Sequence, residues 1–176
     1  MKTVPVDAKR QDWPRLVANA INAFRGQTGW AVYNHGGGPQ ALVAATRTKM
    51  VIDAATKIES QKPNDVDALW DTATNTITGR NGDAILVKAQ CVFTPTDATA
   101  SIINFDVDIG GSVGIVEKQQ FSVTGGAGVP VPISWTFAAY TLNTWEANGG
   151  AIYATADGPG NITEMRVVIQ RTHKAR

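Results

Sequence analysis

The sequence has few of the side chains that most enzyme chemistry requires. A single cysteine, Cys91, excludes an intrachain disulfide. The only histidines, His35 and His173, have no Cys or His partner at the spacing of metal ligands. The sequence contains no HExxH and no glycine-rich phosphate loop followed by lysine. We therefore predict no catalytic residues, no metal site and no cofactor.

Long apolar runs and an excess of one charge are also absent. No window approaches the ~18 apolar residues of a membrane span, and the first residues lack the apolar core of a signal peptide. Sixteen basic and fifteen acidic residues give a net charge of +1, which favours neither nucleic acid nor an anionic membrane as a partner. We expect a protein that is made and matures in a cytoplasm. A local excess of basic residues near the C-terminus is interpreted as a solvated tail: Arg166, Arg171, Lys174 and Arg176.

Charged residues are scarce overall, at 18% against the ~25% that is typical of soluble domains. A surface with few ions costs little to remove from water, because few charges lose their hydration. One interpretation is that much of this surface is buried in an assembly. The other is a Thr-rich β surface that stays in solvent.

The one clear helical pattern lies near the N-terminus. Residues 1–12 are polar and irregular, Asp12 suits a helix N-cap, and Pro14 suits the first turn. Gly26 suits the residue after the last turn. Apolar residues between them recur at the spacing of one helical face: Trp13, Leu16, Val17, Ala20, Ile21 and Phe24. We hypothesise that Trp13, Leu16, Val17, Ile21 and Phe24 attach the protein to a partner, the alternative being that they pack on the chain's own sheet.

From Gly29 onward the apolar residues alternate with polar ones, as in strands. The clearest strand places Ile85, Val87, Ala89, Cys91 and Phe93 on one face, so Cys91 is expected to be a buried, unreactive thiol. Further strands are expected at 30–34, 41–52 (one or two), 56–61, 75–78, 103–109, 112–116, 119–124, 133–137, 151–156 and 165–172. The pattern predicts an all-β sandwich of about eight to ten strands over residues 29–176, preceded by an arm and amphipathic helix over residues 1–28.

Few polar or aromatic residues suggest a site. Asp106 and Asp108 lie two apart on a strand, about 6.6 Å from each other, which suits paired acid–base work on a sugar and also any solvated strand face. We favour the solvated face. A cation there or near Asp71 and Asp83 is conceivable, although no calcium-loop pattern supports it. Trp135 is interpreted as core. Trp70 and Trp145 lie near turns, where burial under a loop is favoured over a contact surface.

The segment WDTATNTITGRNGDAILVKAQCVF, Trp70 to Phe93, resembles the central segment of trimeric jelly rolls of the tumour necrosis factor and complement type. Those domains have an aspartate, a polar Thr/Asn strand, a glycine turn and a long alternating strand. The later segments SIINFDVDIGG, ISWTFAAYTL and DGPGN fit the same pattern, so the resemblance covers roughly residues 40 to 172. It implies a jelly-roll fold and a homotrimer.

The segment DWPRLVANAINAF, Asp12 to Phe24, is similar to a phrase near the start of bacteriophage structural proteins. Together the two resemblances imply a non-enzymatic phage virion protein, a trimer that decorates or cements the head by binding the major capsid protein or other virion proteins. The alternative is a tail-fibre or receptor-binding module of the same fold, although 176 residues leave no room for a long fibre stalk. A small glycan-active enzyme is a third hypothesis, for which no converging acid–base set is visible.

Overall fold

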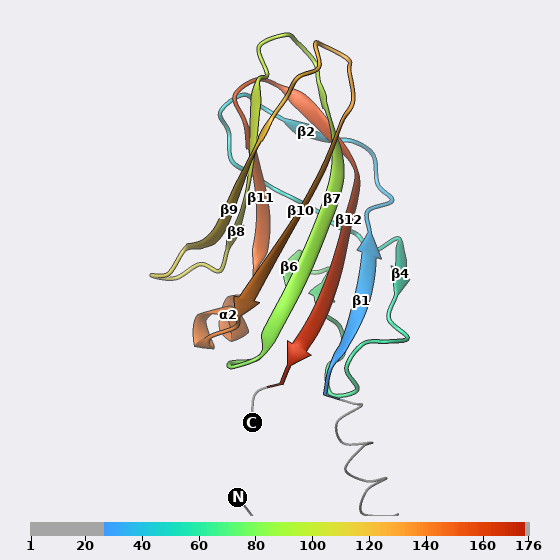
Figure 1. Cartoon of the computed structure of the whole chain (residues 1–176), viewed down its shortest axis with the longest axis vertical. Coiled ribbons are helices and arrows are strands. Elements are labelled where there is room, and N and C mark those ends of the chain that lie inside the picture. Colours follow the sequence, from blue (N-terminus) through green and yellow to red (C-terminus); the bar gives the residue numbers. More distant parts are fainter. Residues whose placement is uncertain (1–26, 175–176) are drawn as a thin grey trace, which may run out of the picture.

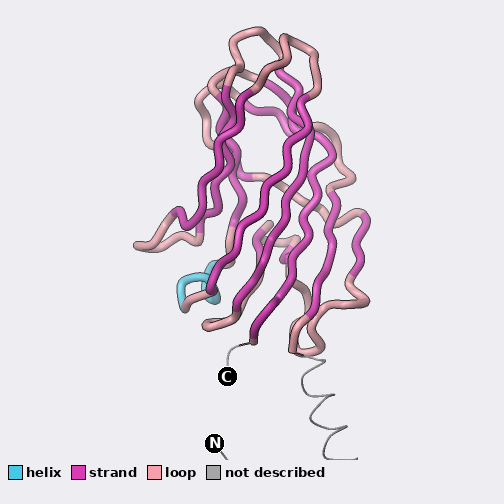
Figure 2. The backbone as a smooth tube through the Cα atoms, viewed as in Figure 1, coloured by secondary structure: helices cyan, strands magenta, loops and turns pink. Residues whose placement is uncertain are grey.

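The computed structural model describes residues 27–174, which form a sandwich of two antiparallel sheets (Figures 1 and 2). The first sheet contains, in spatial order, β10 (Val131–Tyr140), β7 (Ala84–Pro95), β12 (Gly160–His173), β1 (Gly29–Asn34) and β4 (Thr56–Ile58), with β2 (Gln40–Leu42) also paired to β12. The second contains β3 (Thr48–Lys49), β11 (Ala151–Ala156), β8 (Ile102–Asp108) and β9 (Ile115–Ser122). A short hairpin of β5 (Trp70–Asp71) and β6 (Thr76–Ile77) and the helix α2 (Asn143–Asn148) lie beside them.

The chain crosses repeatedly between the two sheets. It passes from β7 in the first sheet to β8 and β9 in the second, then returns to β10, crosses to β11 and ends in β12. Strands that are far apart in the sequence therefore become neighbours, as with β1 and β12. This connectivity confirms the all-β jelly roll that the sequence predicts.

The core lies between the sheets, where the alternating apolar residues meet. Ile85, Val87, Ala89, Cys91 and Phe93 of β7 are all buried, as their alternation predicts. Burial raises the pKa of the Cys91 thiol to about 12, because the thiolate would lose its hydration. Trp135 of β10 stacks on Phe105 of β8 with the ring centroids 4.3 Å apart, so one aromatic pair joins the two sheets.

The last strand, β12, holds the first sheet together because it pairs with three neighbours. It pairs along most of its length with β7, while β2 pairs with its first residues and β1 with its last ones. A register shift lies between Thr163 and Arg166, where Glu164 has φ +54°. This bulge separates the part of β12 beside β2 from the part beside β1.

One of the expected local structures is wrong, and one helix is present that the sequence did not predict. Residues 112–116 and 119–124 were expected to form two strands, but a single strand, β9, spans Ile115–Ser122. The turn before it needs residues with positive φ, and Gly110, Gly111 and Gly114 supply them. Helix α2 was not expected, since six residues are too few to show a helical period.

Trp70 and Trp145 are both buried, which confirms the favoured interpretation of burial over a contact surface. Each indole N–H donates to a backbone carbonyl, Trp70 to Ile52 and Trp145 to Ile77, both at 3.0 Å. The expected helix over residues 12–24 lies outside the described residues. In residues 27–174 no helix is long and apolar enough to cross a bilayer.

Candidate functional site

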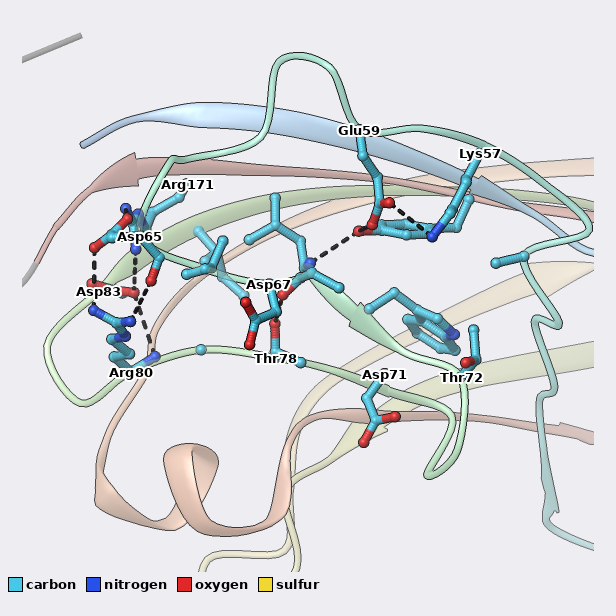
Figure 3. A pocket seen from close by; sticks show the side chains of 18 of the residues that line it. Lys57, Glu59, Asp65, Asp67, Asp71, Thr72, Thr78, Arg80, Asp83 and Arg171 are labelled. Atoms are coloured by element: carbon cyan, nitrogen blue, oxygen red, sulfur yellow. Dashed lines mark hydrogen bonds and ion pairs between the residues drawn. The ribbon is translucent and has the colours of Figure 1, made fainter. Parts of the chain in front are cut away.

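A cleft of about 560 Å³ lies beside β1 and the end of β12. Its walls come from β1 and β4, the segment 65–72, the turn 78–83, the end of β12 and helix α2. Figure 3 shows its polar side chains in three groups, with Arg171, Arg80, Asp65 and Asp83 at one end, Asp67 in the middle, and Glu59 with Lys57 at the other end. We call it the acidic cleft.

The first group is organised by Arg171, which is 1% exposed. Its guanidinium donates to Asp65 and, at 3.3 Å, to Asp83, while its Nε donates to the backbone carbonyl of Gln27 at 2.8 Å. Arg80 and Lys174 also contact Asp65, at 3.2 and 3.0 Å. A buried guanidinium requires such partners, because an unpaired charge away from water is very costly.

The same group controls the ionisation of Asp65. Partial burial disfavours the carboxylate, but hydrogen bonds from Arg171 and Lys174 outweigh that effect and lower the pKa of Asp65 to about 2. The Asp65 carboxylate is therefore charged throughout the physiological pH range.

The group at the other end, Glu59 with Lys57, is linked through Tyr33 to β1 and to the segment 65–72. The Tyr33 hydroxyl donates to Glu59 at 2.8 Å and accepts the Leu69 amide at 2.9 Å, while Lys57 contacts the other oxygen of Glu59 at 2.8 Å. Burial and the bond to Glu59 raise the pKa of Tyr33, so the phenol stays protonated. These contacts position the wall of the cleft.

The cleft carries an excess of negative charge. Six carboxylates line it against three cations, Lys57, Arg80 and Arg171. The Asp67 and Glu146 carboxylates make no ion pair or side-chain hydrogen bond with any described residue, whereas Asp71 accepts from Thr74 and from the Ala73 amide. The structure shows no group of three His, Cys, Asp or Glu arranged to bind a metal anywhere in residues 27–174.

Asp106 and Asp108, the pair weighed from the sequence, lie elsewhere. They lie on the outer face of the second sheet, where Arg47 donates to both, at 3.1 Å to Asp106 Oδ2 and at 2.8 Å to Asp108. The Arg47 guanidinium also lies 3.7 Å from the centre of the Tyr153 ring. Asp106 is buried, so the interpretation of a solvated strand face is wrong for this residue. Asp71 and Asp83 both line the acidic cleft, where Asp83 pairs with Arg171 and Asp71 accepts hydrogen bonds from Thr74 and the Ala73 amide.

The outer face of the first sheet differs sharply from this ionic surface. On that side, residues that pair across β1, β12, β7 and β10 form three rows. These rows are Trp30–Gln170–Leu86–Ala138, Val32–Val168–Lys88–Thr136 and Asn34–Arg166–Gln90–Ser134. We call these residues, with Ile58 beside Val32, the open face, in which Val32 itself is buried. Lys88 and Arg166 are its only charged members, while Trp30 and Leu86 are exposed at 38% and 37%.

Comparisons with known proteins support the fold. No family model matches the chain, and no curated protein matches it. Among solved structures, the chain is similar to Eiger TNF from S. frugiperda, with 13% identity over 85% of this chain and 96% of that one and a TM-score of 0.55. The fold is a jelly roll of this type. The chain also aligns with PRD1 vertex protein P5 at 14% identity, over 85% of this chain and 73% of that one, with a TM-score of 0.45.

The predicted attachment residues Trp13, Leu16, Val17, Ile21 and Phe24 lie outside the described residues, so attachment stays a prediction. The interpretation of the C-terminal basic residues as a solvated tail is wrong for Arg171, which is buried. The sequence contained a signal for this, because Arg171 continues the inward alternation of Met165, Val167 and Ile169.

Replacing Arg171 with Met should lower the free energy of unfolding by about 3 kcal/mol, because Asp65 and Asp83 would keep their charges without their main partner. Urea unfolding at fixed protein concentration measures this. Lys118→Met is the matched control, since Lys118 is an exposed cation on β9, outside the open face, and should change the value by about 0.5 kcal/mol or less. Equal effects of the two substitutions would contradict the role of Arg171.

The lowered pKa of Asp65 predicts a contribution to stability that depends on pH. It should be fully present above the unfolded value of 3.8 and lost as the pH falls toward about 2, because both states are then protonated. Asp65→Asn should therefore destabilise the protein at pH 7, and its difference from wild type should shrink between pH 4 and pH 2. Urea titrations at several pH values test this, with Asp67→Asn as the control from the same cleft. A difference that stays constant over that range would contradict it.

Proposed function

We propose that the protein is a homotrimeric, non-enzymatic structural component of a phage virion, in which the open face forms the contact between copies. The observation that carries the proposal is the contrast between the two outer faces of the sandwich. One carries Arg47, Asp106 and Asp108 as an ionic network. The other is wide and nearly uncharged.

Burying the open face costs little, because few ions on it lose water and the apolar side chains gain contact. Identical subunits favour closed symmetry, since each surface then finds the same partner. The resemblance of residues 40–172 to trimeric jelly rolls makes three the proposed number. The sheet itself can form without the contact, because its inner face already has a core of its own.

The proposal of no catalysis is supported by what surrounds the carboxylates. Asp106 and Asp108 both accept from Arg47 and do not line the acidic cleft. A catalytic pair needs an acid and a base that converge on a shared space. We therefore assign these two aspartates a structural role, in which they hold Arg47 against Tyr153.

Placement in the virion rests on the sequence of the N-terminal segment, whose Trp-Pro-Arg helix pattern is similar to that of phage structural proteins. Within that class we propose decoration of the head, with the arm and helix of residues 1–28 binding capsid subunits. Three arms on one trimer would bind together and gain affinity through multivalency.

The trimer is tested by light scattering coupled to size exclusion. The wild-type protein should have three times the chain mass of 18.7 kDa. Leu86→Glu should yield the single-chain mass, because it would bury an unpaired carboxylate in each contact. Thr155→Glu, on β11 and outside the open face, should leave the mass of the assembly unchanged. A wild-type monomer at micromolar concentration would refute the trimer, and a trimeric Leu86→Glu variant would refute the open face as its contact.

The role in the head is tested on particles that lack the protein. Such particles should lose their genome more readily when heated, and adding back the full chain should restore their resistance. Particles that are as heat-resistant as wild type but no longer adsorb to cells would contradict head decoration and support the receptor-binding alternative.

A further inference from the structure

We propose that the acidic cleft binds the chain's own basic N-terminal segment, residues 1–11. This contact lies outside the open face and does not depend on the trimer. The first observation is the charge of the cleft, where six carboxylates face the three cations of the lining and Lys174, which contacts Asp65. Because Asp65, Asp83 and Glu59 pair with those cations, the negative charge that remains comes from Asp67, Asp71 and Glu146.

The second observation is where the N-terminal segment joins the domain. Arg171, a residue of the cleft wall, donates to the Gln27 carbonyl at 2.8 Å. The chain therefore enters the sandwich at the rim of the cleft. Since β1 follows directly at Gly29, everything before Gln27 starts from this point.

The length of the segment suits a return to the cleft. Twenty-six residues precede Gln27 in the sequence, and a chain of that length, which starts at the rim of the cleft, is long enough to reach back into it. A tethered segment has an effective concentration in the millimolar range, so even a weak contact is populated.

The third observation is chemical complementarity. Lys2, Lys9 and Arg10 outnumber the one acid of the segment, Asp7. Lysine and arginine side chains suit Asp67 and Glu146, carboxylates with no partner among residues 27–174. Between the basic residues, Val4-Pro5-Val6 offers apolar contact to Val66 and Ala54 of the cleft wall.

Limited trypsin digestion of the full-length protein tests the contact, with cleavage after Lys9 and Arg10 followed by mass spectrometry. Bound in the cleft, this site should be cleaved about five-fold more slowly in wild type than in the Asp67→Asn, Glu146→Gln double variant. Glu117→Gln, a matched substitution on β9 away from the cleft, should behave as wild type. Salt at 0.5 M should remove the difference, because it screens exposed charges. Equal cleavage of wild type and the double variant, in proteins with the same melting temperature, would overturn the proposal.

A zero-length carbodiimide cross-link identifies which copy supplies the segment. Isotopically labelled and unlabelled full chains are unfolded and refolded together, then cross-linked. Links from Lys2 or Lys9 to Asp67 or Glu146 should join two peptides that are either both labelled or both unlabelled. Linked pairs with one labelled and one unlabelled half would overturn the own-chain assignment in favour of a neighbouring copy, and a lack of such links would overturn binding to the cleft. Neither test requires a trimer, so a monomeric protein would refute the proposed contact between copies without deciding this one.

Discussion

The buried guanidinium of Arg171 is the interaction on which one end of the molecule depends. A side chain that is 1% exposed and permanently charged must be surrounded by acceptors. Asp65, Asp83 and the Gln27 carbonyl supply them, and they come from three separate parts of the chain. One residue thus fixes the segment 65–72, the turn before β7 and the start of the domain against the end of β12. The wall of the acidic cleft follows from the same contacts.

The open face follows from a different constraint, the pairing of strands. A sandwich buries only the inner face of each sheet, so the register of β1, β12, β7 and β10 decides which side chains stay outside. The second sheet satisfies its outer face internally through Arg47, Tyr153 and two aspartates. The first sheet has no comparable network among the described residues. The few charged residues of the sequence are therefore distributed unevenly between the two outer faces. This uneven distribution supports the interpretation that part of the surface is buried in an assembly, rather than the interpretation of a Thr-rich surface that stays in solvent.

The sequence predicted the strands whose alternation is regular, such as β7 and β8, because each inward residue meets the same core. It failed where a contact distant in sequence decides the outcome. Arg171 looks like part of a basic tail until Asp65 and Asp83 are placed beside it, although its inward position in β12 was a usable signal. The pairing of Arg47 with Asp106 spans 59 residues, so no local pattern marks it. The acidic cleft could not be predicted, since its carboxylates come from four segments that only the fold brings together.

The proposed trimer and the proposed cleft contact both involve the N-terminal arm, so the arm must be able to leave the cleft when the trimer binds a capsid. In a closed trimer the three Gln27 positions are related by one axis and lie in one plane, so all three arms start from the same level of the assembly. A segment bound in its own cleft must leave it before it can bind a capsid. Contacts between exposed charges are weak, at about 1 kcal/mol or less for each pair, so release is inexpensive. Attachment by three arms at once gains far more through multivalency. The proposed cleft contact is therefore compatible with attachment because it is weak. Before assembly it would hold the N-terminal arm close to the domain, and during assembly binding to the capsid would replace it.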